Sequence, residues 1–351
     1  MKISTVIGAR PQFIKAAVVS RSLRAYRSDI EETIVHTGQH YDANMSDIFF
    51  EELDIPKPSC HLGIGGGTHG ENTGRMIEAI ERHLLEARPD WMLVFGDTDS
   101  TLAGVIAASK LNIPISHVEA GLRSYNRRMP EEVNRILTDH VSQLLFTPTD
   151  VATENLRKEG ISGPNVIQAG DVMYDAALFY RARARRPQLV TLEGEFVLST
   201  IHRAENTDDP SRLAGIFGAL SEVAKRRPVV IPLHPRTRAL LLRSRIDTGD
   251  ILIVDPVSYL EMAWLLGRCA LVVTDSGGLQ KEAYFVGKRC VTTRDETEWV
   301  ELVEAGWNTL AGSSQKRIVC AISSALDASG TVRPGDLYGT GDAGREIAKS
   351  F

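Results

Sequence analysis

Two glycines stand where a helix is expected to begin, in the segment "TDSGGLQKEA", residues 274–283. Ser276, Gly277 and Gly278 follow an apolar run that ends at Asp275. Because glycine has no side chain, backbone N–H groups at such a helix N-terminus can approach a phosphate group closely. The pattern predicts phosphate binding, and the alternative is an ordinary N-cap by Asp275 or Ser276 beside flexible glycines.

Two aspartates follow another apolar run, "WMLVF". Asp97 and Asp99 have the spacing of a metal-binding DxD motif. Asp99 could instead cap the helix that is expected to begin near Ser100. We expect no metal here.

The segment "HVEAGLRSYNRRMPEEVNR", residues 117–135, contains three glutamates and four arginines, and the apolar run "NIPISHV" leads into it. Only 24% of the whole chain is charged, so this density is unusual. Glu119 and Arg123 follow the expected strand directly, at the end where ligands bind in open parallel sheets. The "PEEVNR" part could also be an ordinary helix start with acidic residues in its first turn.

Charged and polar residues follow every expected strand in the same way. In the first half they are Arg10, Lys15, His36, Gln39, His40, Asp97, Asp99, Glu119 and Arg123. In the second half they are His202, Arg203, Glu205, Asn206, His234, Arg236, Asp275–Gly278, Arg294 and Glu298. Any single histidine in these sets could be structural. Together they predict that both halves present charged strand ends to one shared cleft.

The elements that would position these residues alternate between short apolar runs and amphipathic helical segments. Residues 72–87 place Met76, Ile77, Ile80, Leu84 and Leu85 on one helical face, and "WMLVF" is typical of a parallel strand that is buried on both sides. The alternation predicts an α/β fold with doubly wound parallel sheets. The "GAR" turn near Gly8 lacks the full GxGxxG pattern, so a dinucleotide-binding site is not expected.

The pattern restarts after a charged segment with Pro and Gly at 181–195, which we interpret as a linker. We therefore expect a Rossmann-like domain at 1–175, a second one at 190–335, and a C-terminal helix at 336–351 that returns to the first domain.

Composition limits the possible functions. The chain has 351 residues, 43% of them hydrophobic, and a formal net charge of -5, which argues against nucleic-acid or membrane-surface binding. Its four cysteines form no CxxC pair, and no segment resembles a signal peptide or approaches 18 apolar residues. A reduced, cytoplasmic chain is expected.

Seven motifs, in order and in register, resemble the non-hydrolysing UDP-N-acetylglucosamine 2-epimerase family. They are "GARPQFIKAA", "HTGQHYD", "FGDTDSTLAG", "HVEAGLRS", "MPEEVNR", "HPRT" and "TDSGGLQKEA". The resemblance implies a GT-B-type architecture of two Rossmann domains, a UDP-sugar substrate, no cofactor and a homodimer. It also implies the chemistry: UDP leaves carbon 1 as the carbon-2 proton is removed, and UDP then adds back to the glycal while a proton arrives on the opposite face.

The resemblance also implies roles for individual residues. Asp97, Glu119 and Glu131 occupy the family's catalytic acidic positions, and we expect Asp97 and Glu131 to be the proton-transfer pair. His202 is expected to protonate or bind the leaving diphosphate. The expected substrate-binding residues are Arg10, Lys15, Gln39, Arg123, Arg203, His234, Ser276, Gly277, Gly278, Glu282 and Arg294, with Glu282 on the ribose hydroxyls.

Some motifs depart from the usual family pattern. "GTRPE" is "GARPQ" here, "TERPE" is "TEWVE", and Tyr41 and Asp42 follow "QH". These departures leave two substrates open: UDP-N-acetylglucosamine, and the UDP-2,3-diacetamido-2,3-dideoxyglucuronate used in surface polysaccharides. Allosteric regulation by UDP-N-acetylglucosamine is also left open. A hydrolysing epimerase, a glycosyltransferase and a non-catalytic sensor remain alternative functions.

Overall fold

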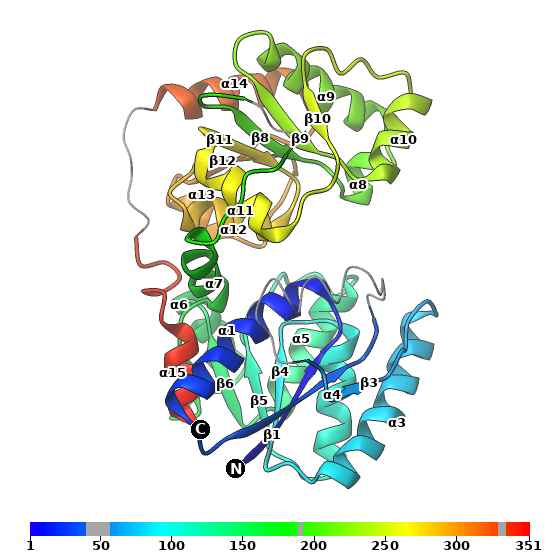
Figure 1. The fold of residues 1–351 in the computed structure, drawn as a ribbon, viewed down its shortest axis with the longest axis vertical. Coiled ribbons are helices and arrows are strands. Elements are labelled where there is room, and N and C mark those ends of the chain that lie inside the picture. Colours follow the sequence, from blue (N-terminus) through cyan, green and yellow to red (C-terminus); the bar gives the residue numbers. More distant parts are fainter. Residues whose placement is uncertain (40–56, 189–191, 329–334) are drawn as a thin grey trace. The chain divides into compact units, whose positions relative to one another are not determined.

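The computed structural model describes residues 1–39, 57–188, 192–328 and 335–351. The chain divides into two compact units (Figure 1). Unit 1 comprises Met1–Ala176 and Asp336–Phe351, and unit 2 comprises Ala177–Gly335. Each unit is built around one parallel sheet with helices, and each is described by itself.

Unit 1 contains a seven-stranded sheet with the order β3-β2-β1-β4-β5-β6-β7. Its strands are β1 (Lys2–Ile7), β2 (Glu31–His36), β3 (Cys60–His61), β4 (Trp91–Phe95), β5 (Ile115–Val118), β6 (Leu144–Thr147) and β7 (Val166–Gln168). Its helices are α1 (Arg10–Tyr26), α3 (His69–Ala87), α4 (Asp99–Lys110), α5 (Pro130–Val141), α6 (Asp150–Lys158), α7 (Val172–Arg181), which continues into unit 2, and α15 (Ala343–Ser350).

Unit 2 contains a six-stranded sheet with the order β10-β9-β8-β11-β12-β13. Its strands are β8 (Val197–Thr200), β9 (Val229–Pro232), β10 (Leu252–Val254), β11 (Leu271–Thr274), β12 (Cys290–Thr292) and β13 (Asn308–Leu310). Its helices are α8 (Ala204–Thr207), α9 (Pro210–Ala224), α10 (Pro235–Arg243), α11 (Tyr259–Arg268), α12 (Gly277–Phe285), α13 (Val300–Glu304) and α14 (Gln315–Asp327).

The strand order reverses direction once in each sheet. In unit 1 the first strand, β1, pairs with both β2 and β4, and in unit 2 β8 pairs with both β9 and β11. Parallel sheets with this order bind ligands beyond the carboxyl ends of the strands at the reversal. The predicted α/β class with two Rossmann-like sheets is confirmed.

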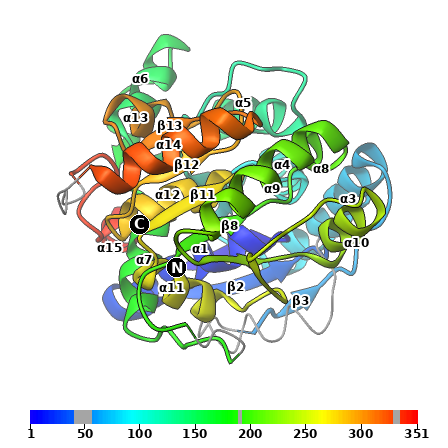
Figure 2. The ribbon, with the colours of Figure 1, turned by 90° about the horizontal axis from the view of Figure 1, so that it is seen from above.

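The cores form because apolar residues meet from both faces of each sheet. In β4, Met92, Leu93, Val94 and Phe95 are fully buried, as expected for a central parallel strand. In unit 2, α9 and α14 lie side by side (Figure 2) and pack on the same face of the sheet.

One predicted helical face is only partly correct. Met76, Ile80 and Leu84 of α3 are buried, but Leu85 is 56% exposed. Leu85 follows Leu84 directly, so it lies about 100° further around the helix and points away from the sheet.

Helix α15 belongs to unit 1, although all of unit 2 precedes it in the sequence. It packs against α1 so closely that a Cβ on Gly344 would lie 2.8 Å from Cγ1 of Val18. The carboxylate of Asp175, in α7, accepts hydrogen bonds from the N–H groups of Ala343 (3.1 Å) and Gly344 (2.8 Å). These bonds satisfy donors at the N-terminus of α15, which have no partner within the helix.

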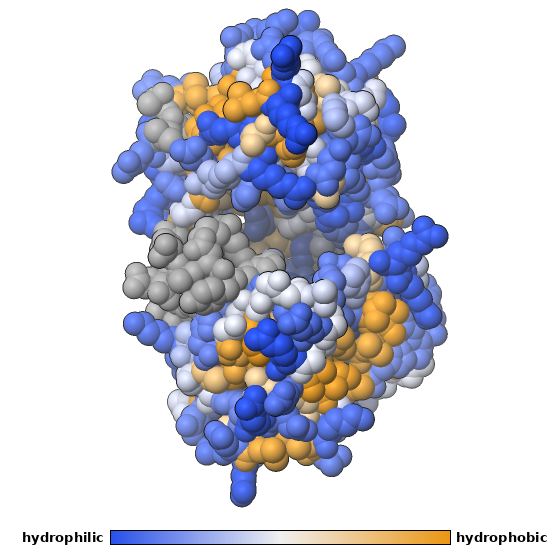
Figure 3. Space-filling view, turned by 90° about the vertical axis from the view of Figure 1, so that its right-hand side faces the viewer, coloured by the Kyte–Doolittle hydropathy of each residue, from blue (hydrophilic) through white to orange (hydrophobic). Residues whose placement is uncertain are grey.

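Hydrophilic residues cover most of the face seen in Figure 3, and apolar residues form separate patches on both units. Within the described residues, no helix combines the length and the apolar character needed to cross a membrane.

Candidate active site

A pocket of about 190 Å³ opens in unit 1 beyond the ends of β1 and β4. Its lining comes from the start of α1, the β4–α4 connection and the first turn of α5, together with Gln39 and His69. Of the residues predicted for the site, Lys15, Gln39, Asp97 and Glu131 line this pocket. Carboxylates from separate strands and helices therefore meet in one place.

Asp97 follows β4 and forms an ion pair in the lining of the pocket. Its Oδ2 lies 2.6 Å from Nη2 of Arg135, in α5. Burial raises the pKa of Asp97, and the nearby Glu119 adds to the rise, while Arg135 and Lys15 reduce it. A carboxyl group with a raised pKa is suited to taking up and releasing a proton near neutral pH.

Glu119 lies at the end of β5 with a left-handed backbone, at a φ of 75°. Such a conformation is strained for a residue with a side chain, and strain of this kind is concentrated at functional sites. The ammonium group of Lys15 contacts the Glu119 carboxylate. Gly96 makes room for this pair, because a Cβ there would lie 3.1 Å from Oε2 of Glu119 and 3.2 Å from Nζ of Lys15.

Two adjacent glutamates at the start of α5 have different environments. Glu131 lines the pocket. The Glu132 carboxylate instead accepts hydrogen bonds from the N–H groups of Ser124 (2.9 Å) and Tyr125 (2.8 Å), and contacts Nη1 of Arg135 at 2.8 Å. The charged segment at 117–135 therefore contributes one glutamate to the lining of the pocket and another that holds the loop before α5.

His69 also lines the pocket, although no role was predicted for it. Its Nδ1 lies 2.7 Å from Oδ2 of Asp99, and this hydrogen bond raises the pKa of His69. Asn134 donates to the backbone oxygen of Asp97 (2.9 Å) and to Oδ1 of Asp99 (3.3 Å). No sequence motif contains both His69 and Asp99, and only the fold brings the two residues together.

The prediction that Asp99 caps α4 is wrong. Thr98 is the N-cap, with its Oγ1 accepting from the N–H of Thr101 at 3.2 Å, and Asp99 is the first residue of the helix. Asp99 is instead held by His69 and Asn134. Within the described residues, no three His, Cys, Asp or Glu side chains form a group that could hold a metal ion.

Gln12 explains one departure from the usual motif. Its Oε1 accepts from the N–H groups of Gly8 (2.8 Å) and Ala9 (3.0 Å), while its Nε2 donates to the backbone oxygen of Phe95 (2.9 Å) and to Thr101. An ionised glutamate could not donate to a carbonyl oxygen. The amide therefore joins the β1–α1 turn to the end of β4, on either side of the pocket.

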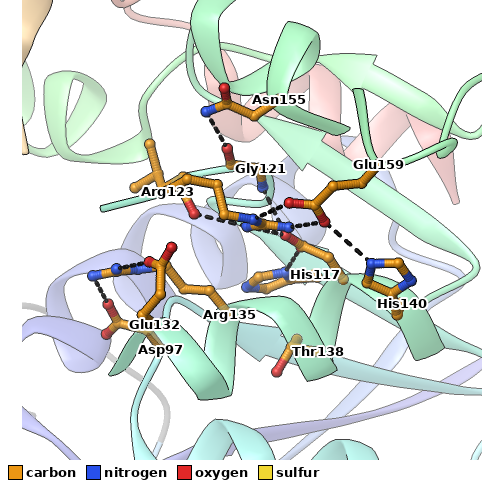
Figure 4. A network of polar contacts seen from close by, with 12 residues as sticks. Asp97, His117, Gly121, Arg123, Glu132, Arg135, Thr138, His140, Asn155 and Glu159 are labelled. Carbon is orange, nitrogen blue, oxygen red and sulfur yellow. Dashed lines mark hydrogen bonds and ion pairs between the residues drawn. The ribbon is translucent and has the colours of Figure 1, made fainter. Parts of the chain in front are cut away.

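Arg123 does not line the pocket, in contrast to the substrate-binding role expected for it. It is buried, with Nη1 2.7 Å from Oδ2 of Asp139 and Nε 2.7 Å from Oε1 of Glu159 (Figure 4). Asp139 is fully buried and Glu159 is partly exposed, and the two carboxylates together occupy the guanidinium. The substrate-binding role expected for Arg123 stays a prediction.

One predicted site residue, Arg10, is only partly described. Arg10 is the first residue of α1, and its side chain lies outside the described part of the chain, as do His40, Tyr41 and Asp42. Gln39 is described, and its Oε1 accepts from the N–H (3.1 Å) and the hydroxyl (2.6 Å) of Ser100.

In unit 2, the glycine pair lies at the N-terminus of α12. Ser276 is the N-cap, and its Oγ accepts from the N–H of Leu279 at 3.4 Å. A Cβ on Gly277 would lie 2.2 Å from Oε1 of Glu298, so a larger residue at this position would displace the Glu298 carboxylate. The indole Nε1 of Trp299 donates to the backbone oxygen of Gly277 at 2.9 Å. The cap interpretation is thus correct, and the helix N-terminus also has the geometry suited to an anion.

Asp275 holds the loop that carries His202. This fully buried carboxylate accepts from the backbone N–H groups of His202 and Arg203, and from Nδ2 of Asn206, each at 3.1 Å. The His202 side chain is itself 53% exposed, with Nδ1 3.4 Å from Oδ1 of Asp275. A ligand could therefore reach the imidazole.

Glu298 joins the two predicted arginines of unit 2. Its Oε2 lies 2.7 Å from Nη1 of Arg294, and its Oε1 lies 3.6 Å from Nη2 of Arg203. Burial alone would raise the pKa of Glu298, but Arg294 and Arg203 outweigh it and lower the pKa.

The remaining two predicted residues of unit 2 have distinct surroundings. His234 is the N-cap of α10, with Nδ1 accepting from the N–H of Arg236 at 3.2 Å. Glu282 lines a small cavity of about 20 Å³ with Tyr259 and Arg181.

Comparisons with known proteins agree on one family. The sequence model of a family described as UDP-N-acetylglucosamine 2-epimerase matches residues 23–351. The UDP-2,3-diacetamido-2,3-dideoxy-D-glucuronate 2-epimerase of Pseudomonas aeruginosa is 55% identical over 99% of both chains. The UDP-N-acetylglucosamine 2-epimerase of Methanocaldococcus jannaschii is 40% identical over 99% of this chain and 98% of the relative.

Solved structures give the same result. The Methanocaldococcus jannaschii enzyme in complex with UDP-GlcNAc and UDP has a TM-score of 0.89, and covers 100% of this chain and 99% of its own. The UDP-GlcNAc 2-epimerase of Neisseria meningitidis bound to UDP-GlcNAc has a TM-score of 0.90 at 31% identity, with the same coverage. The chain therefore belongs to the UDP-N-acetylglucosamine 2-epimerase family.

Proposed function

We propose that this chain is a non-hydrolysing 2-epimerase that inverts carbon 2 of a UDP-2-acetamido sugar. The observation that carries the assignment is the unit 1 pocket, in which Asp97 and Glu131 both form part of the lining. Inversion requires that a proton leaves one face of the ring and another arrives on the opposite face, which two carboxyl groups can accomplish.

In the proposed reaction, one carboxylate of the pair removes the carbon-2 proton. The C–H electron pair forms a double bond between carbons 1 and 2, and the bond from carbon 1 to the UDP oxygen breaks. UDP then adds back to carbon 1 of the glycal, and the other carboxyl group delivers a proton to the opposite face of carbon 2. No net oxidation occurs, and UDP is regained in the product.

We assign Glu119 to the sugar or to tuning its neighbours, because its carboxylate already contacts Lys15. Lys15, His202 and the N-terminus of α12 are the proposed donors to the diphosphate, since a departing anion needs positive charge or N–H groups. Arg10 keeps the same proposed role from the family motif. Gln39, Arg203, His234, Gly278, Glu282 and Arg294 remain proposed substrate-binding residues.

For the sugar we favour UDP-2,3-diacetamido-2,3-dideoxyglucuronate. This choice is supported by the 55% identity to the Pseudomonas aeruginosa relative of that name over nearly the whole chain. UDP-N-acetylglucosamine is the second candidate, supported by the 40% identity to the Methanocaldococcus jannaschii enzyme.

NMR of the purified protein with each UDP-sugar, in heavy water, tests both the reaction and the substrate. We expect a new anomeric signal, larger with the diacetamido uronate, and product that carries deuterium at carbon 2 because the delivered proton comes from a group that exchanges with water. Inverted product with full protium at carbon 2 would contradict the two-carboxylate route. Release of UDP together with free sugar would instead identify a hydrolysing epimerase.

A further inference from the structure

A fully buried ion pair lies in unit 1, beside the two turns that carry Asp97 and Glu119. His117 is in β5 and Asp139 is in α5, and both side chains have no exposed surface. The imidazole Nδ1 of His117 lies 2.7 Å from Oδ1 of Asp139. Neither residue lines the pocket, so the pair cannot touch a substrate bound there.

Both ring nitrogens of His117 face atoms that can only accept hydrogen bonds. Nε2 lies 2.9 Å from the backbone oxygen of Gly96, and a carbonyl oxygen has no proton to give. Nδ1 faces Asp139, whose other oxygen accepts from the N–H of Gly121 (3.1 Å) and from Nη1 of Arg123 (2.7 Å). Burial would raise the pKa of Asp139, but His117 and Arg123 outweigh it and lower the pKa.

When Asp139 is ionised, neither of the two acceptors has a proton to donate, so both Nδ1 and Nε2 of His117 must carry one. A neutral imidazole has one N–H donor, whereas an imidazolium has two. The hydrogen-bond pattern therefore requires the doubly protonated form. A buried cation is tolerated when it is paired and hydrogen-bonded, which is the case here.

The two contacts of this cation hold the backbone next to the proposed catalytic residues. Gly96 directly precedes Asp97, and the N–H of Gly121, bound by Asp139, lies two residues after Glu119. Gly96, Glu119 and Gly121 all have left-handed backbone conformations, with φ values of 60°, 75° and 80°. Of these three, only Glu119 is strained, because glycine adopts this conformation without steric cost, and a strained residue persists only where its surroundings hold it.

We propose that His117, as an imidazolium, and Asp139 form a positioning pair that fixes the turns presenting Asp97 and Glu119. The inference rests on the proposed function, and adds two residues that hold the carboxylates at the correct distance from the sugar. Small displacements of a catalytic group are costly, because a shift of about 1 Å can reduce the rate by roughly 10²-fold.

The charged groups around the pair are balanced. Arg123 contacts both Asp139 and Glu159, and His140 lies 3.1 Å from Oε2 of Glu159. On the pocket side, Lys15 contacts Glu119, and Arg135 contacts Asp97 and Glu132. Each of these carboxylates thus has a cationic partner, and Asp139 is the anion that contacts the imidazolium.

Two substitutions of His117 separate its two contacts. The amide nitrogen of Asn lies near the position of Nδ1, so His117→Asn keeps the donor to Asp139 and releases Gly96. The amide nitrogen of Gln lies near the position of Nε2, so His117→Gln keeps the donor to Gly96. We expect kcat to fall by roughly 10-fold to 10²-fold in His117→Asn and by clearly less in His117→Gln, with KM little changed in both.

Glu159→Gln is the matched control. It removes the charge of a carboxylate that binds Arg123, and it leaves both contacts of His117 unchanged. Its kcat should stay near that of the wild type, even if its melting temperature falls as far as those of the His117 variants. Equal kcat values for His117→Asn and His117→Gln would overturn the positioning role.

The protonation state is tested on the wild-type protein by NMR of ¹⁵N-labelled histidine, which distinguishes an imidazolium with two N–H groups from a neutral imidazole with one. We expect one histidine with both ring nitrogens protonated, and its signals should be absent from the His117→Gln spectrum. A neutral imidazole pattern for His117 would overturn the inference. If the wild type inverts neither UDP-sugar, the proposed function fails, and the nitrogen spectrum still decides the state of His117.

Discussion

Arg135 Nη2 lies 2.6 Å from Oδ2 of Asp97, in the lining of the unit 1 pocket. Burial raises the pKa of Asp97, and the charge of Arg135 offsets part of this rise. Replacing Arg135 with Met should therefore raise the pKa of Asp97 further. If ionised Asp97 is the base, a smaller fraction of the enzyme is active at a given pH, and the acidic limb of the kcat profile moves to higher pH. Arg135→Lys keeps the charge and should move the limb much less, and an unchanged profile in Arg135→Met would argue against Asp97 as the base.

Asp97→Asn and Glu131→Gln each remove one proposed proton-transfer group. Loss of a general acid or base typically reduces the rate by about 10²–10⁴-fold, so turnover should fall by at least the lower of these values while UDP still binds. Glu132→Gln is a matched control, because Glu132 holds the backbone of Ser124 and Tyr125 rather than lining the pocket. This variant should have a lower melting temperature and a kcat close to that of the wild type. Near-normal turnover in both Asp97→Asn and Glu131→Gln would exclude them from the chemistry.

Adjacent glycines at the N-terminus of α12 should respond differently to alanine. A Cβ at position 277 would lie 2.2 Å from Oε1 of Glu298, whereas at position 278 the nearest atom would be 4.0 Å away. Gly277→Ala should destabilise the protein by about 1–3 kcal/mol, as overpacking does, and should weaken UDP binding because Glu298 and the arginines bound to it must move. Gly278→Ala should leave the melting temperature unchanged. Thermal unfolding and UDP titration distinguish the two, and equal melting temperatures would contradict the prediction.

The stability of unit 1 should depend on pH through Asp175. Burial raises the pKa of this carboxyl group to about 6. An unfolded aspartate has a pKa of about 3.9, so between about pH 4 and pH 6 the folded state holds a proton that the unfolded state has released. The contribution of Asp175 to the free energy of unfolding is therefore fully present below about pH 4 and is lost as the pH rises through about 6.

Asp175→Asn cannot titrate and isolates this effect. The stability of the variant relative to the wild type should increase by up to about 3 kcal/mol between pH 4 and pH 7, at about 1.4 kcal/mol per unit of pKa shift. Urea unfolding at several pH values measures the difference. A difference that does not change with pH would mean that the pKa of Asp175 is not raised.

The fold could be predicted because its signals are local. Continuous apolar runs such as "WMLVF" indicate strands buried on both faces, and polar residues at their ends indicate the binding edge. Whether a charged side chain enters the pocket depends instead on partners that are distant in the sequence. Arg123 and Glu131 belong to one charged segment, yet Arg123 is held in the interior by Asp139 and Glu159. The roles assigned to individual site residues remain predictions.

Three contacts show why the rest could not be predicted. His69 meets Asp99 across 30 positions, and His117 meets Asp139 across 22. Thr98 rather than Asp99 caps α4, although both residue types are good N-caps. In each case several residues have suitable chemistry, and the course of the backbone determines which of them makes the contact. That course is known only from the tertiary structure.

The return of α15 to unit 1 has a consequence for synthesis on the ribosome. Domains usually fold in the order in which they emerge, but unit 1 needs residues 336–351, which are translated after all of unit 2. Until they emerge, the face of α1 that Gly344 and its neighbours cover remains open to solvent. Unit 2 can therefore be completed during synthesis while the face of α1 that packs against α15 is still uncovered.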